Sequence, residues 1–143
     1  MGTTLITDTP GGAGVVATVV GQVSSVASNA TDTGQPICRC KNAGSVLSAF
    51  FIPSASQAGS ATNYRTPKLI NMGSAGTGTT VIASITALSA STGSVIANTA
   101  KAMTMTTTAA DYTVAAGDIL AWYTTKSGDG IAINAGDVQI DFM

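Results

Sequence analysis

The chain has 143 residues, of which 45% are hydrophobic and only 9% are charged, with a formal net charge of −1. This length suits one domain that buries a core without disulfides, and the many valines, isoleucines and threonines argue against disorder. The charge balance gives no electrostatic basis for binding nucleic acid or an anionic membrane, because both need clustered lysine and arginine. No signal peptide and no apolar run of about 20 residues is visible, so we expect synthesis in the cytoplasm and no membrane partner.

The first part of the chain differs from the rest in the pattern of its residues. Residues 1–36 are predicted to form an N-terminal arm that can include one strand, and residues 37–143 are predicted to form a β-sandwich domain. The apolar residues of the arm do not alternate cleanly, so a strand or extended arm is favoured, although their spacing also permits a short helical turn. The candidate contact residues of the arm are Leu5, Ile6, Val15, Val16, Val19 and Val20.

The two cysteines, Cys38 and Cys40, are two residues apart, so on a strand both point to the same face. Zinc sites and redox motifs need other spacings, and the chain has no histidine. We therefore interpret the pair as free thiols that act as small hydrophobic residues, with no metal or cofactor.

A series of short strands is predicted from the middle of the chain onward. Ser45 to Pro53 is the most apolar run of the first half, and Pro53 should end this strand or place it at a sheet edge. From Lys68, strand-like runs alternate with turns at spacings of roughly 8 to 12 residues, which is typical of an antiparallel sandwich. The glycine-rich run 73–78 lacks the lysine of a phosphate loop and is predicted to be a hairpin loop.

The closing stretch 111–143 repeats a turn-then-strand device, since Ala-Gly-Asp precedes an apolar residue at 116–119 and again at 135–138. In the last strand, Val138, Ile140 and Phe142 should face one way and Gln139 and Asp141 the other. The adjacent Trp122 and Tyr123 should point to opposite faces, so that at most one of them lies in the core.

Reaction chemistry is not indicated. Without histidine or glutamate, neither a Ser-His-Asp nor a Cys-His arrangement can be built. Three aspartates lie in Gly-Asp pairs, namely Asp118, Asp129 and Asp137. Carboxylates of this kind can serve a glycosidase or bind calcium, but turn formation already accounts for these three. We expect a protein that is not an enzyme, and expect its working surface in the first half of the chain and in the loops.

The second half, Leu69 to Met143, resembles structural proteins of tailed bacteriophages, in particular head decoration (cement) and head-fibre proteins. The resemblance lies in the order of its phrases: an apolar strand, a Ser-Ala-Gly-Thr-Gly-Thr turn, a Ser-Thr-Gly turn, a threonine-rich strand, the run 112–119 and a final hairpin. It implies a jelly-roll or related β-sandwich that assembles, commonly as a trimer, and attaches to a capsid shell. The implied partner is the major capsid protein, and the implied location is the outer surface of the virion head.

Two other classes of function stay open. A receptor- or glycan-binding fibre head would use exposed aromatic residues, for which Tyr64, Trp122 and Tyr123, with Tyr112, are the candidates. The low aromatic content of 5% disfavours it. A pilus-like or surface-layer subunit would share the low charge and the many threonines but would need an export signal.

Overall fold

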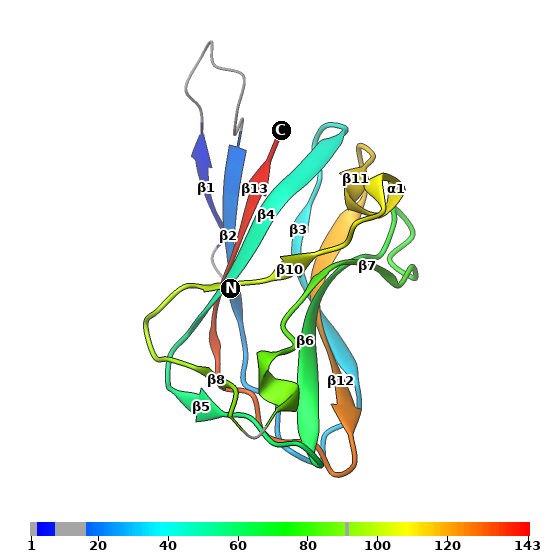
Figure 1. Ribbon diagram of the computed structural model, residues 1–143. Coiled ribbons are helices and arrows are strands. Elements are labelled where there is room, and N and C mark those ends of the chain that lie inside the picture. Colours follow the sequence, from blue (N-terminus) through cyan, green and yellow to red (C-terminus); the bar gives the residue numbers. More distant parts are fainter. Residues whose placement is uncertain (1–2, 8–16, 91) are drawn as a thin grey trace.

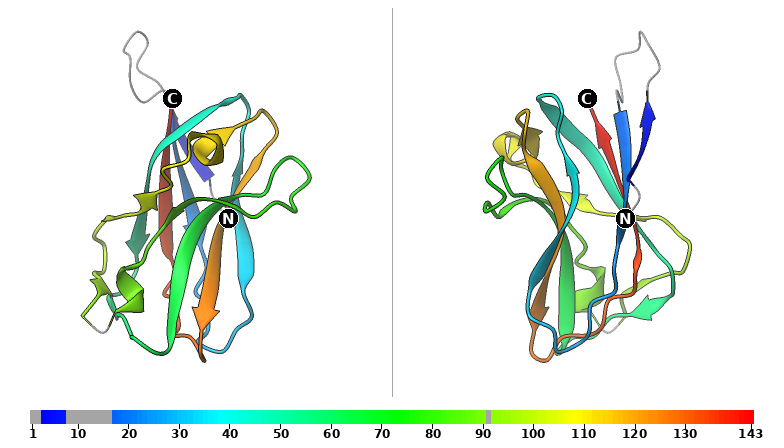
Figure 2. Two further views of the ribbon diagram at one scale, coloured as in Figure 1. Left: turned by 45° about the vertical axis from the view of Figure 1, so that its right-hand side comes forward. Right: turned by 180° about the vertical axis from the view of Figure 1, so that it is seen from behind.

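The strands form where β-branched and aromatic residues alternate with small or polar ones. The computed structural model describes residues 3–7, 17–90 and 92–143. Two antiparallel sheets pack face to face as a sandwich, which confirms the predicted fold class (Figure 1, Figure 2).

The six-stranded sheet contains, in order, β1 (Thr3–Thr7), β2 (Ala17–Val23), β13 (Gly136–Phe142), β4 (Gly44–Pro53) and β11 (Thr113–Val114), while β9 (Lys101–Ala102) also pairs with β4. The five-stranded sheet contains β10 (Thr104–Met105), β7 (Thr80–Ser84), β6 (Tyr64–Asn71), β12 (Ile119–Ser127) and β3 (Thr33–Arg39). The remaining elements are the paired β5 (Gln57–Ala58) and β8 (Ser94–Val95), the 3-10 helix η1 (Ala87–Ser89) and the short α1 (Ala109–Tyr112).

The connectivity is that of a jelly roll. Going from β2 to β3, β4 and β6, the chain passes each time to the opposite sheet, and the last strand, β13, returns to lie between β2 and β4. The orders β2-β13-β4 and β3-β12-β6-β7 interleave the two halves of the chain in both sheets.

The N-terminal third is woven into this arrangement. β2 pairs with β13 along seven residues, and β3 pairs with β12, so residues 17–36 contribute β2 and most of β3 to the two sheets. β1 pairs with β2 and lies at the edge of the six-stranded sheet. Gly21 of β2 leaves no room for a Cβ beside Ile37 of β3, which shows how closely the two sheets approach at this side.

The core lies between the sheets and is centred on an aromatic contact. Trp122 of β12 and Phe51 of β4 have ring centroids 4.7 Å apart, and both side chains are almost wholly buried. Val138 and Ile140 of β13 are 0% exposed, as predicted for the inward face of the last strand. Trp122 is likewise 0% exposed, so the prediction that it is a surface aromatic is wrong, whereas Tyr123, on the other face, is partly exposed.

The region 80–105 departs most from prediction. The strand-like run 80–88 is a strand only in its first part: β7 ends at Ser84 and the chain turns into η1, where Leu88 is 0% exposed. The threonine-rich run is divided: β9 pairs with β4 in one sheet and β10 with β7 in the other, and the Met103 N–H between them bonds the Ala49 carbonyl at 2.9 Å. The chain therefore crosses from sheet to sheet at Met103.

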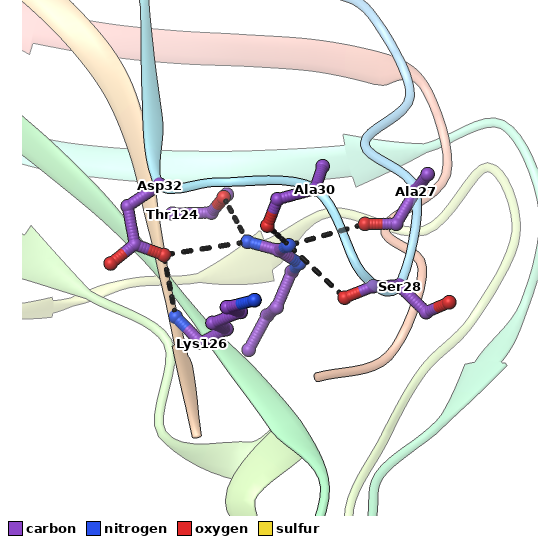
Figure 3. A network of polar contacts seen from close by, with 7 residues as sticks. Ala27, Ser28, Ala30, Asp32, Thr124 and Lys126 are labelled. Atoms are coloured by element: carbon purple, nitrogen blue, oxygen red, sulfur yellow. Dashed lines mark hydrogen bonds and ion pairs between the residues drawn. The ribbon is translucent and has the colours of Figure 1, made fainter. Parts of the chain in front are cut away.

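A buried arginine closes one end of the sandwich (Figure 3). Arg65, at the start of β6, is 0% exposed, and its Nη2 donates to the carbonyls of Ala27, Ser28 and Ala30 in the β2–β3 loop. Its Nη1 donates to Thr124 Oγ1 at 3.3 Å and lies 3.6 Å from an Asp32 carboxylate oxygen.

Asp32 adds a second link to β12 beside Thr124, because the carboxylate oxygen near Arg65 also accepts a 2.9 Å hydrogen bond from the Lys126 N–H. Arg65 thus holds together a loop of the first half, a strand of the middle and a strand of the second half. The guanidinium suits this role because it offers five donors in a fixed plane.

Replacing Arg65 with methionine should destabilise the protein strongly, because three loop carbonyls lose their donor and the charge of Asp32 loses its partner. We expect the free energy of unfolding to fall by about 3 kcal/mol, measured by urea denaturation. The matched control is Lys41→Met in the exposed β3–β4 turn. Equal unfolding midpoints for the two variants would show that the Arg65 network contributes no stability.

Candidate docking surface

The outer face of the six-stranded sheet is formed chiefly by β2, β13 and β4, three strands that contain no lysine or arginine. Because side chains alternate along a strand, the burial of Val138 and Ile140 directs Asp137, Gln139 and Asp141 outward. Among the described elements, β13 makes its extensive contacts with β2 and β4, which lie on either side of it in the same sheet.

Three rows of side chains cross this face, each centred on β13. Gln139 lies opposite Val20 and Phe50, Asp141 opposite Thr18 and Ser48, and Asp137 opposite Gln22 and Ile52. We define the docking face by the first row and the side chains around it: Thr18, Val20, Gln22, Ser48, Phe50, Ile52, Asp137, Gln139 and Asp141.

The carboxylate of Asp141 is satisfied within the face. It accepts hydrogen bonds from Thr18 Oγ1 at 2.7 Å, Ser48 Oγ at 2.6 Å and Gln139 Nε2 at 3.3 Å, and the residue is only 9% exposed. Three donors from three strands therefore surround a charge that would otherwise dominate the middle of the sheet. A partner would meet chiefly uncharged side chains there.

Charge is distributed unequally between the two sheets. In the six-stranded sheet, the strands β1, β2, β4 and β13 contain no lysine or arginine, and the short β9 carries Lys101. In the five-stranded sheet, β3, β6 and β12 carry Arg39, Lys68 and Lys126, besides the buried Arg65. The nine residues of the docking face include no cation, and one of their two carboxylates, that of Asp141, already accepts three hydrogen bonds. Such a face is suited to contacts that do not depend on ion pairs.

Exposed apolar residues lie at one end of this sheet. Met143 exchanges two backbone hydrogen bonds of 2.9 Å with Ser45, and the register shift between β13 and β4 leaves Leu47 without an opposite residue. Their side chains are 57% and 38% exposed. Together with Ile96, at 59%, they are the exposed large hydrophobic residues of the described chain.

An open groove of about 670 Å³ lies at the other end of the same strands. Gln22, Ile52 and Asp137 line it, together with Asn98, whose φ of 56° places it in the left-handed region that asparagine tolerates. The docking face thus lies between the exposed apolar residues at one end of the strands and this open groove at the other.

The predicted contact residues of the arm are only partly brought to this face. Val19 is in the core with 8% exposure, which removes it from any outer contact, whereas Val20 faces outward and is partly exposed. Leu5 and Ile6 occupy the register positions opposite Val19 and Thr18. Val15 and Val16 lie outside the described residues.

The candidate aromatic residues do not converge. Tyr64 begins β6 opposite Ser127, and Tyr123 lies in the middle of β12 over Gly34, where an added Cβ would come within 3.3 Å of the tyrosine ring. Tyr112 packs partly against the core. No pair of exposed rings therefore forms a sugar-binding platform in the described chain.

The three Gly-Asp aspartates have different surroundings. The Asp118 carboxylate accepts hydrogen bonds from the Ala115 N–H at 2.9 Å and from Asn71 Nδ2 at 2.7 Å, which is the predicted turn-forming role. Gly117 before it has a φ of 96°, a conformation that favours glycine. Asp137 does not have the turn-forming role that the sequence predicts for it. It lies within β13, because the Gly136 backbone already pairs with both neighbouring strands.

The sequence directed attention to the first half of the chain and to the loops, which includes Val20 but not Gln139 or Phe50. The available signal was the absence of lysine and arginine from the segments that became β2, β4 and β13. That signal could not be used without knowing that these three segments, distant in the chain, lie side by side.

The hydrogen bonds from Asn71 and from the Ala115 N–H lower the pKa of Asp118 below its usual value. A lowered folded pKa means that the stabilisation is present above the unfolded value of about 3.9 and is lost as the pH falls through the folded pKa. Asp118→Asn should therefore be less stable than the parent near neutral pH, and this difference in urea midpoint should shrink on acidification to about pH 2.

The exposed Asp129→Asn is the control, since the described chain shows no hydrogen bond to its carboxylate. A difference for Asp118→Asn that is constant with pH would contradict the assigned role of the carboxylate charge.

No helix in the described ranges is long and apolar enough to span a membrane. Residues 3–7, 17–90 and 92–143 contain no group of three or more histidine, cysteine, aspartate or glutamate side chains placed to hold a metal ion. No protein-family model, no curated protein and no solved structure matches the chain.

Proposed function

We propose that this protein is a non-enzymatic structural protein that binds the outer surface of a tailed-bacteriophage capsid and stabilises it. The observation that carries the proposal is the docking face, a sheet surface without lysine or arginine in which the Asp141 carboxylate already accepts hydrogen bonds from Thr18, Ser48 and Gln139. The sequence resemblance of the second half to head decoration proteins supplies the class of partner, the major capsid protein.

The physical character of the face fits the task. Ion pairs between exposed groups contribute little and are screened by salt, so a protein that must stay attached in varied media is better held by apolar and hydrogen-bonded contacts. Modest contacts also add up when many copies attach to a symmetric lattice.

Assembly into a homo-oligomer, with a trimer favoured by the resemblance, is part of the proposal. A net charge of −1 provides little self-repulsion between copies. Exposed Leu47 and Met143 at the end of the six-stranded sheet are available for such contacts.

A glycan- or receptor-binding head is the alternative. The burial of Trp122 removes its largest aromatic candidate, and Tyr64 and Tyr123 would have to act singly. Clear saturable binding of the isolated protein to host cells or to a glycan array, without binding to heads, would favour this alternative.

Gln139→Lys places a positive charge at the centre of the docking face while the core is left unchanged. We expect the variant to fold with an unfolding midpoint close to that of the parent, but to lose at least about tenfold in affinity for expanded phage heads, because close contact with the partner would strip water from a long charged side chain at the centre of the face. Co-sedimentation with purified heads is the measurement.

The matched control is Thr125→Lys, a partly exposed position on the outer side of the five-stranded sheet, opposite Thr66. It should bind as the parent does. Equal binding by both lysine variants would exclude the docking face as the site of attachment.

Deleting residues 1–14 tests whether the N-terminal arm contributes to attachment. The truncation removes β1 but keeps β2 and its seven-residue pairing with β13, so the sandwich should still fold. Attachment to heads should weaken, since the edge of the docking sheet is lost. Circular dichroism checks the fold and co-sedimentation the attachment, and unchanged binding would count against a role for the arm.

A further inference from the structure

The open groove at one end of the docking face holds a carboxylate that has no partner among the described residues. Asp137 lines this groove of about 670 Å³ and is partly exposed. In the part of the chain that the structure describes, its carboxylate makes no hydrogen bond and no ion pair, whereas the Asp141 carboxylate accepts three hydrogen bonds. Of the two carboxylates in the docking face, one is satisfied within the protein and the other is available to a group from outside.

The basic residue of the same sheet lies on its other face. The strands β2, β4 and β13, which supply most of the groove lining, contain no lysine or arginine. The short β9 carries Lys101, at the register position opposite Phe51 of β4. Phe51 is buried in the core, whereas Asp137 lies opposite the next residue, Ile52. Because side chains alternate along β4, the positions of Lys101 and Asp137 are on opposite faces of the sheet.

The groups around the carboxylate suit a long basic side chain. In its row across the sheet, Asp137 lies between Gln22 of β2 and Ile52 of β4. The Gln22 amide oxygen is a second acceptor, and Ile52 and Pro53 offer apolar surface against which methylene groups can pack. A calcium ion is served less well, because it takes about six to eight oxygen ligands and Asp137 is the only carboxylate among the described residues that line the groove.

The walls of the groove are held by backbone hydrogen bonds that do not involve the Asp137 side chain. The Ser54 N–H donates to the Ala135 carbonyl at 2.8 Å, which ties the end of β4 to the segment before β13. The Asn98 N–H donates to the Pro53 carbonyl at 2.8 Å, which ties the segment after β8 to the end of β4. The groove is therefore formed before any partner arrives, and a change of the carboxylate should leave its walls in place.

We propose that this groove binds a lysine or arginine side chain of the partner polypeptide, with its charged end on Asp137 and Gln22 and its methylene stem on Ile52. The inference rests on the proposed function, because the partner is the protein that covers the docking face. The remainder of the face supplies contacts without direction, and the ion pair in the groove fixes the orientation in which the partner docks. Charge complementarity at the edge of an interface commonly has this effect on register.

Asp137→Asn removes the charge and keeps the shape of the side chain. The measurement is co-sedimentation of the full-length protein with purified expanded heads at about 0.05 M and about 0.5 M NaCl. At the lower salt concentration, we expect the parent to bind about fivefold more tightly than the variant, and this difference should shrink at the higher one, because salt screens the ion pair. The urea midpoints of the two proteins should be equal, since the carboxylate has no partner in the described chain.

The matched control is Asp129→Asn, which makes the same change in net charge at an exposed position outside the groove lining and should bind as the parent does. Asp137→Lys should bind more weakly than Asp137→Asn at the lower salt concentration, because two like charges then meet.

Equal binding by the parent and Asp137→Asn at both salt concentrations overturns the inference and leaves attachment to heads intact. Failure of the parent to sediment with heads overturns the proposed function, and the inference with it. If EDTA abolishes the difference between the parent and Asp137→Asn, the occupant of the groove is a divalent cation, and a basic side chain is excluded.

Discussion

The structure at one end of this sandwich depends on the burial of one guanidinium, which joins the β2–β3 loop to β6 and β12. Arg65 is fully enclosed, and a charge in that position is tolerated only because carbonyl and hydroxyl oxygens and a nearby carboxylate surround it. Its partners come from the β2–β3 loop and from β12, segments that lie far apart in the chain. The carbonyls of Ala27, Ser28 and Ala30 in turn obtain a donor that no strand supplies, although the Arg65 Nε is buried without a hydrogen-bond partner.

The two faces of β13 connect this scaffold to the proposed task. Val138 and Ile140 on one face complete the core against the Trp122–Phe51 contact, and Gln139 and Asp141 on the other face form the middle of the docking face. A single alternating segment therefore contributes both to stability and to surface. Since Asp141 is held by donors from β2 and β4, the polarity of the surface depends on the same strand pairing that builds the core.

Prediction from sequence succeeded where a segment is long and regularly patterned. The apolar run ending at Pro53 is β4, the glycine-rich run 73–78 connects β6 and β7, and the last strand has the predicted inward and outward faces. It failed between residues 80 and 105, where short segments choose between two sheets. Met103 illustrates the reason. The residues before it pair with β4 and those after it pair with β7, and the local sequence pattern does not distinguish the two partners.

The candidate site was less accessible than the fold. Trp122 and Tyr123 are adjacent and equally aromatic, and only their position relative to the opposite sheet decides that the first is core and the second surface. In the same way, Asp118 and Asp137 follow identical Ala-Gly pairs, yet one carboxylate closes a turn and the other lies on a strand beside an open groove.

By itself, the sequence determined the all-β class, the low surface charge and the absence of histidine and glutamate, because these follow from composition and from the two-residue period of strands. Only the tertiary structure decided the jelly-roll connectivity, the burial of Arg65 and Trp122, and the alignment of β2, β13 and β4 into one face without lysine or arginine. The physical reason is that strand pairing is a long-range choice. Its energy comes from contacts between segments whose local patterns are alike, so that register and partner are set by the packing of the whole chain.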